Sequence, residues 1–123
     1  GGDNGCMARK IDTEEGRPAV RAALGDAPAR QQTAMAVRYL LQLLEEKAPG
    51  KSVEVRVPPF GAVQVIQGLS HHRGTPPNVV ETDAATWLAL ATGANTWTDA
   101  VLEGRIAVSG TRADISGILP VRW

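Results

Sequence analysis

The sequence predicts a small α+β domain, and two patterns lead to this fold class. Apolar residues recur at helical spacing between residues 29 and 47, whereas apolar and charged residues alternate from Val53 to Val57 as in a half-buried strand. Hairpin-length links join this strand pattern to the next ones, and further helix signals flank the cluster. This order is typical of α+β proteins rather than of alternating α/β proteins.

Length and charge exclude several classes of protein. A chain of 123 residues fits one domain with a modest core. Its thirteen basic and thirteen acidic residues are spread along the chain, so no basic block is available to neutralise the phosphates of a nucleic acid. A run of about 18 apolar residues, as a membrane-spanning helix needs, is absent from the sequence.

Residues 1–10 are expected to form a tail, disordered or left over from cloning, and residues 11–123 a single domain. Met7 is the expected natural start, with the preceding residues as an upstream extension. Cys6 is the only cysteine, so an intramolecular disulfide is excluded, and a tail residue is expected rather than a reactive thiol. Neither Gly1 nor Met7 begins a signal-peptide pattern, which makes the cytoplasm the expected location.

Two helices are expected before the strands. Asp12 is a candidate cap, but Gly16 and Pro18 interrupt the pattern, so a cleaner helix is expected from Pro18 through Leu24. The next helix, over residues 29–47, is the best in the sequence. Its apolar stripe consists of Val37, Leu40, Leu41, Leu44 and Ala48. Its solvated side is marked by Arg38, Gln42, Glu45 and Glu46.

Three strands are expected in the middle of the chain. The strand from Val53 to Val57 should turn its apolar face to the long helix, and Pro58-Pro59 then forces a turn or bulge. Residues 60–66 are expected to form the second strand, and residues 67–77 a polar loop with room for a short edge strand. Val79 to Glu81 is the third strand.

Glycines divide the final third into short elements. Asp83 caps a helix that Gly93 closes, and Thr96 caps another that ends at Gly104. Residues 105–109 alternate as a strand. A last helix is expected to start at Thr111 with Asp114 and to run through Leu119 until Pro120 stops it.

This final third resembles the sterol carrier protein family. The family typically shows a strand, an Asp-initiated helix ending in glycine, a short helix, a glycine-bounded strand and an apolar last helix. The matching segments are Glu81 to Gly93, Trp97 to Val101, Gly104 to Gly110 and Ala113 to Ile115. Two more segments are similar to a bacterial branch of small stand-alone members, Val57 to Gln64 and Arg73 to Glu81. The likeness covers about residues 30–119.

The resemblance implies a mixed sheet of about five strands, with helices packed on one face and an apolar tunnel between sheet and helices. A fifth strand would lie within residues 67–73. The peroxisomal address of animal members is not carried over, because this chain ends in Pro120 to Trp123. The family name therefore describes a fold and does not identify a sterol ligand.

The expected function is non-catalytic binding of a lipid or another small apolar molecule, without a cofactor. A single Phe and a single Tyr in the chain are consistent with a hollow interior. The residues expected to line this cavity are Leu40, Leu44, Val55, Leu88, Leu90, Val101, Ile106, Val108, Ile115 and Leu119. No nucleic-acid partner and no integral membrane segment are expected. The alternative is a filled-core interaction or accessory module that docks a partner or forms a homodimer.

Catalytic and metal sites are not predicted. His71 and His72 are adjacent, so on an extended segment their side chains point apart, whereas zinc needs three or four converging ligands. An enzyme built around these two histidines stays the third hypothesis. Ser109 lacks the Gly-x-Ser-x-Gly elbow of a nucleophile, and Asp114 is explained as the acidic partner of the Thr111 cap.

The three tryptophans have different expected roles. Trp87 and Trp97 are expected to anchor their short helices on the sheet, because each combines a large apolar area with a single N–H donor. For Trp123 three roles stay open: a disordered end, a lid, or a contact with a partner.

Overall fold

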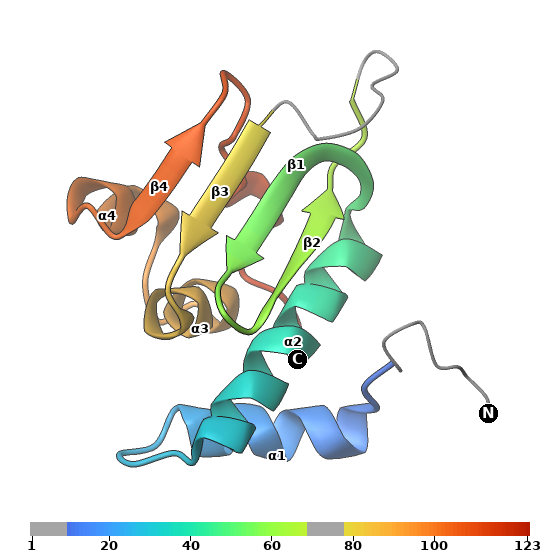
Figure 1. The fold of residues 1–123 in the computed structure, drawn as a ribbon, viewed down its shortest axis with the longest axis vertical. Helices are drawn as coiled ribbons and strands as arrows, with labels where there is room; N and C mark the ends of the chain where they lie inside the picture. Colours follow the sequence, from blue (N-terminus) through green and yellow to red (C-terminus); the bar gives the residue numbers. More distant parts are fainter. Residues whose placement is uncertain (1–9, 69–77) are drawn as a thin grey trace.

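The computed structural model describes residues 10–68 and 78–123, and within them four strands form one mixed sheet (Figure 1). The strand order is β2-β1-β3-β4. β1 (Pro49–Val57) pairs antiparallel with β2 (Gly61–Val65) and parallel with β3 (Asn78–Thr82), and β3 pairs antiparallel with β4 (Ile106–Ser109). The predicted α+β class and mixed sheet are confirmed. The fifth strand expected within residues 67–73 falls mostly outside the described residues, and residues 67 and 68 are not in a strand.

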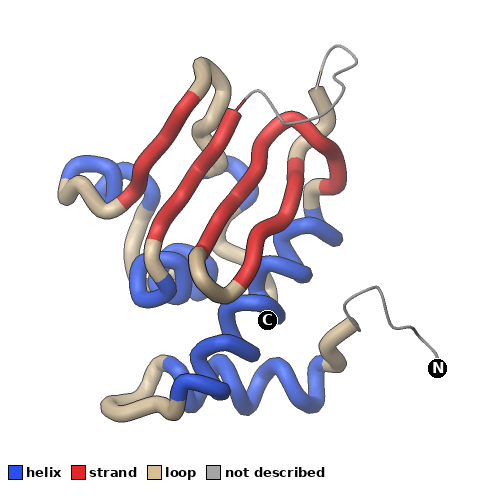
Figure 2. Tube along the Cα trace, in the orientation of Figure 1, coloured by secondary structure: helices blue, strands red, loops and turns tan. Residues whose placement is uncertain are grey.

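The helices α2 (Arg30–Lys47) and α3 (Ala84–Thr92) lie behind the sheet in the view of Figure 1. α4 (Trp97–Leu102) lies beside the start of β4, and α1 (Thr13–Ala23) crosses the first turns of α2 away from the sheet (Figure 2). No described helix covers the front face of the sheet in this view. Among the described residues, the helices that pack on the sheet therefore lie on one of its faces, as predicted.

The alternation in β1 decides which sheet face is buried. Val53, Val55 and Val57 are fully buried toward the helices, whereas Glu54 and Arg56 point to the opposite face. On that face the Arg56 Nε lies 2.6 Å from a Glu54 carboxylate oxygen. The hydrogen bond with Glu54 and its negative charge raise the pKa of Arg56 above its ordinary value. The predicted strand from residue 53 to residue 57 is confirmed.

Helix α2 is the central packing element. Four residues of its predicted apolar stripe, Val37, Leu40, Leu41 and Leu44, are at most 2% exposed, as expected. The fifth, Ala48, is half-buried and lies just after the last residue of the helix. Trp87 of α3 is 1% exposed, and its Nε1 donates a hydrogen bond to the Val37 carbonyl at 3.3 Å. The expected role of Trp87 as an anchor for α3 is confirmed, since the ring satisfies its only donor inside the core.

The first helix begins earlier than the sequence indicates. α1 starts at Thr13 and runs through Gly16 and Pro18 without a break, and the Asp12 carbonyl accepts hydrogen bonds from the backbone N–H groups of residues 15 and 16. The prediction of a start near Pro18 is wrong because Gly16 is buried against the Tyr39 ring of α2. This close approach of the two helices compensates for the weak helix propensity of the glycine and the proline.

The predicted last helix is also wrong. Only a single 3-10 turn, η1 (Ser116–Ile118), forms in this part of the chain. The Asp114 carboxylate accepts a hydrogen bond from the Ser116 N–H at 2.8 Å, and the Arg112 N–H donates to the Asn78 side chain at 2.9 Å. These side-chain interactions compete with helical hydrogen bonds, so the segment after β4 crosses the core in an irregular conformation.

Replacing Gly16 with alanine should lower the free energy of unfolding by about 2 kcal/mol, as overpacked helix interfaces do. The new Cβ would overlap the Tyr39 ring, which is 2% exposed and enclosed by the core. Chemical denaturation followed by circular dichroism measures the effect. Gly117→Ala is the control, because no neighbouring heavy atom lies within 4 Å of a Cβ there. If Gly16→Ala is as stable as Gly117→Ala, the close packing of α1 on α2 described above is wrong.

Candidate functional site

Most residues expected to line a cavity are part of the packed core. Leu40, Leu44 and Val55 are 0% exposed, and the others in this group are almost as buried. These others are Ile115 at 1%, Leu90 at 2% and Leu88 at 5% exposed. Ile106 and Leu119 are half-buried and pack against the same cluster. The structure therefore brings these residues together in one core cluster, except for Leu90, which is buried outside it.

Val101 and Val108 lie apart from that cluster. Val101 of α4 is 43% exposed and Val108 of β4 is 52% exposed. Val108 points to the helix side of the sheet, because it pairs with the buried Val80 of β3. The helix side of β4 is thus less covered than that of β1, since the chain after β4 does not form the expected helix.

The C-terminal segment closes the core on the helix side. Ala113, Ile115 and Val121 are at most 6% exposed, and Trp123 packs half-buried against the same cluster. The Val121 N–H donates to the Ala91 carbonyl of α3 at 2.9 Å, which fixes the end of the chain. The expectation of a disordered end for Trp123 is therefore wrong, because the residue folds back on the core.

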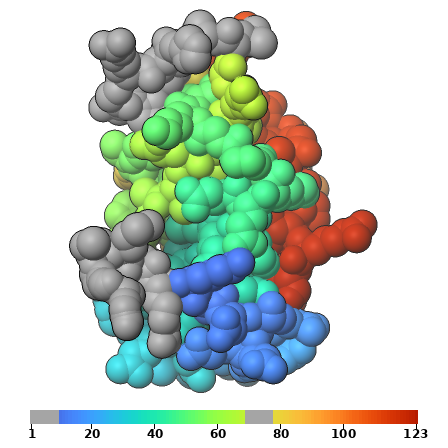
Figure 3. Space-filling view, turned by 90° about the vertical axis from the view of Figure 1, so that its right-hand side faces the viewer, coloured from blue at the N-terminus to red at the C-terminus, as the bar shows by residue number. Residues whose placement is uncertain are grey.

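A groove of about 530 Å³ lies on the outside of the domain, where the segment before α1 meets α2 and β2. Figure 3 faces this side, with the blue residues before α1, green α2 and yellow-green β2 close together. Its apolar lining consists of Ile11, Leu41, Phe60 and Val63, together with Gly61 and Ala62. Its polar lining consists of Lys10, Arg38, Gln42, Glu45 and Glu46. The volume falls within the usual range of small-molecule sites, about 300–1,000 Å³.

Arginine side chains gather at the Phe60 end of this groove. The Arg38 Nε donates a hydrogen bond to the Phe60 carbonyl at 2.9 Å, which orients the guanidinium. The Arg30 guanidinium lies over the Phe60 ring, 5.0 Å from its centroid. Within the described part of the chain neither arginine has a carboxylate partner, whereas Lys10 pairs with Glu46 at 3.2 Å. One end of the groove therefore presents unneutralised positive charge.

Sequence reasoning missed this site. Arg38, Gln42 and Glu45 follow each other at helical spacing, and this pattern predicts the solvated side of the long helix. In the structure they belong to the polar lining of the groove, to which Phe60 also contributes. No signal in the sequence separates such a helix face from an ordinary solvated one, because the segment before α1 and the residues of β2 that complete the groove are distant in the chain.

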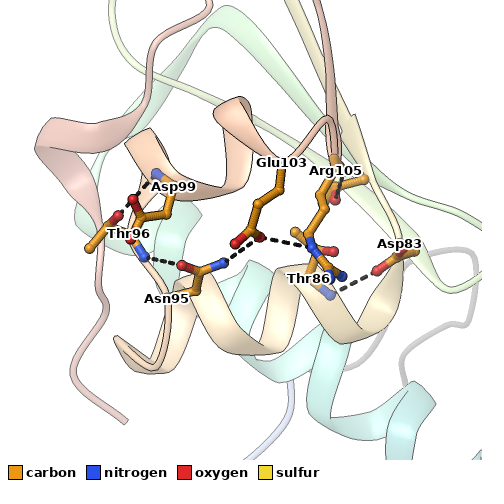
Figure 4. A network of polar contacts seen from close by, with 8 residues as sticks. Asp83, Thr86, Asn95, Thr96, Asp99, Glu103 and Arg105 are labelled. Atoms are coloured by element: carbon orange, nitrogen blue, oxygen red, sulfur yellow. Dashed lines mark hydrogen bonds and ion pairs between the residues drawn. The ribbon is translucent and has the colours of Figure 1, made fainter.

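A second polar cluster lies around α3 and α4 (Figure 4). Asp83 accepts from the Thr86 N–H at 2.7 Å, and Thr96 Oγ1 accepts from the Asp99 N–H at 3.1 Å, so both predicted helix caps are confirmed. The Glu103 carboxylate accepts from the Arg105 Nε at 2.9 Å. Each of these contacts caps the start of a helix or fixes the link before β4, and together they assemble no nucleophile with a base.

Catalytic and metal candidates gain no support from the described residues. His71 and His72 lie outside residues 10–68 and 78–123, and within these ranges no group of three His, Cys, Asp or Glu side chains is placed to hold a metal ion. Ser109 is exposed at the end of β4. The hydrogen bond from Ser116 lowers the pKa of Asp114 from its ordinary value, so this carboxylate caps a local turn and does not pair with Thr111 as predicted.

The fold and the groove together define a small α+β domain with a candidate binding site on its surface. No helix in the described part of the chain is long and apolar enough to cross a membrane. A family model described as that of the bacterial SCP orthologues, SCP standing for sterol carrier protein, matches residues 29–121. The chain therefore belongs to this family, and the resemblance is confirmed. A search of curated proteins finds no match.

Charged substitutions at two of the expected cavity residues should differ strongly in their effect on stability. Leu90→Lys should lower the free energy of unfolding by more than about 4 kcal/mol, because the ammonium would be buried without a partner. Val101→Lys should change it by less than about 0.5 kcal/mol, because that side chain is 43% exposed. Thermal and urea denaturation measure both. A cooperative, stable Leu90→Lys variant would show instead that Leu90 borders a space open to solvent.

Proposed function

We propose that the protein binds a lipid or another small apolar molecule without catalysis, and that the groove between α2 and β2 is the binding site. Two observations support this proposal. The chain belongs to the bacterial sterol carrier protein orthologue family, and the groove combines an apolar lining with a volume of about 530 Å³. The groove is the observation that carries the proposal. In the described residues, fully buried side chains occupy the space between sheet and helices, so the ligand is placed at the surface.

The positive charge at the Phe60 end of the groove favours an amphiphile with an anionic head, because Glu45 and Glu46 line the groove about two turns further along α2. Arg38 is held by the Phe60 carbonyl with its Nη groups free of any carboxylate in the described residues. A guanidinium oriented in this way binds a carboxylate or phosphate through charge-assisted hydrogen bonds. The apolar part of the ligand would lie along Leu41 and Val63, where each fully buried methylene contributes about 0.8 kcal/mol.

Binding without catalysis follows from the residue types in the groove. Among the described residues, its lining contains no Ser, Thr, Cys, His or Tyr side chain. Glu46 is paired with Lys10 at 3.2 Å, and Glu45, its neighbour on α2, points about 100° away around the helix. Glu46 is therefore engaged with Lys10, and among the described lining residues no Ser, Thr or Cys nucleophile lies beside Glu45 to be activated.

Dodecanoate should bind to the wild-type protein at least about tenfold more tightly than dodecyltrimethylammonium, which has a chain of equal length and a cationic head. Arg38→Ala should remove most of this preference. Isothermal titration calorimetry measures both affinities.

The location of the site is tested by a matched pair of valines on the two edge strands of the described sheet. Val63 of β2 pairs with the buried Val55, so Val63→Glu places a carboxylate on the helix side, in the groove, and should abolish dodecanoate binding. Val108→Glu on β4, on the same face at the other edge, should leave dodecanoate binding unchanged. If Val63→Glu folds and binds dodecanoate as the wild type does, the groove is not the site.

Docking of a second copy of the chain is a second function that one observation favours. Leu102, Val108 and Val101 are 79%, 52% and 43% exposed, and they all belong to α4 and β4. β4 is also an end strand of the described sheet, and an end strand with apolar neighbours is a common pairing edge. Sedimentation velocity should then show a dimer that Leu102→Asp converts to a monomer. If the wild type is a monomer at high concentration, the homodimer hypothesis is wrong.

A further inference from the structure

We infer that the segment before the family-matched region is part of the ligand site, and that Gln42 is the residue that positions it. This inference rests on the proposed function of the groove. Lys10 and Ile11 form one side of the groove, opposite Phe60 and Val63 of the sheet side. Both residues precede residue 29, where the match to the family model begins. Part of the binding site is therefore contributed by a segment outside the matched residues.

Gln42 binds this segment through both ends of its side-chain amide. The Ile11 N–H donates to Gln42 Oε1 at 2.8 Å, and Gln42 Nε2 donates to the Ile11 carbonyl at 2.9 Å. The amide thus pairs with the backbone of Ile11 as a neighbouring strand would, and satisfies both polar groups of one residue. Gln42 is half-buried, so the two hydrogen bonds are partly shielded from water.

Gln42 acts together with the Ile11 side chain, which packs half-buried against the core cluster, whereas the remaining contact of the segment is weak. Lys10 pairs with Glu46 at 3.2 Å, but their side chains are 72% and 46% exposed, and such surface ion pairs contribute little. The packing of Gly16 on Tyr39 fixes α1, and the segment enters α1 through Asp12. With α1 held at one end, the Gln42 amide sets the position of Ile11 and aims its side chain at the groove.

The apolar side chain of Ile11 gives the groove its third side. Phe60 and Val63 on the sheet side, and Leu41 on α2, contribute the other apolar surfaces. A ligand covered from three sides loses more apolar surface to the protein than one lying on α2 and β2 alone. Gln42 therefore determines how tightly an apolar chain is held, while Arg38 selects its head group.

The experiment uses the full chain, with dodecanoate as the probe. Gln42→Ala should bind dodecanoate about tenfold more weakly than the wild type. The control is Gln31→Ala, a change on the exposed side of α2 away from the groove, which should bind as the wild type does. Amide hydrogen exchange measures the hydrogen bond from Ile11 to Gln42 directly. The Ile11 N–H should lose its protection from exchange in Gln42→Ala and keep it in Gln31→Ala.

A double-mutant cycle separates positioning from a general loss of structure. Ile11→Ser should weaken dodecanoate binding by several-fold in the wild type and by less than about twofold in Gln42→Ala, because the segment is then no longer held at the groove. If Gln42→Ala exposes the Ile11 N–H but binds dodecanoate with wild-type affinity, or if the two substitutions are additive, the inference is overturned while the proposed function stands. If the wild type binds no dodecanoate, the proposed function fails and the inference with it.

Discussion

Helix α2 contacts three different neighbours, and the rest of the structure depends on how it divides its surface among them. Leu40 and Leu44 are fully buried in the core that α2 shares with the sheet and α3. Tyr39 lies against Gly16 of α1. Because a helix has 3.6 residues per turn, residues 38, 42 and 45 share the remaining side. That side is the one that Lys10, Ile11 and β2 enclose as the groove.

The packing of the core is an argument for an external site. Any ligand that entered between sheet and helices would first displace the C-terminal segment, in which Ile115 and Val121 are 1% and 6% exposed. Exposing two such side chains costs about 1.5–3 kcal/mol each. Repacking Trp87 would add the loss of its hydrogen bond to Val37. A groove that already exists at the surface requires none of these changes.

Local signals could be predicted from the sequence, and contacts between distant segments could not. Asp83 and Thr96 cap their helices as predicted, because a cap depends on residues only three positions away. The helix expected after Thr111 is absent because Asp114 bonds its own neighbour instead. Gly16 looked like a helix breaker, since only the tertiary structure shows the Tyr39 ring that requires it. The groove was missed for the same reason.

The open shape of the groove limits the affinity that the proposed function can reach. An alkyl chain of about ten methylenes, half covered, gains about 4 kcal/mol, and one charge-assisted hydrogen bond adds about 1.5–3 kcal/mol. The loss of translational and rotational freedom, at least about 4 kcal/mol, cancels much of this gain. Because the net gain is small, a third apolar side of the groove that is already in place raises the affinity more than a second charged contact would. Ile11 covers more of the chain without being ordered by the ligand, because Gln42 already holds its backbone.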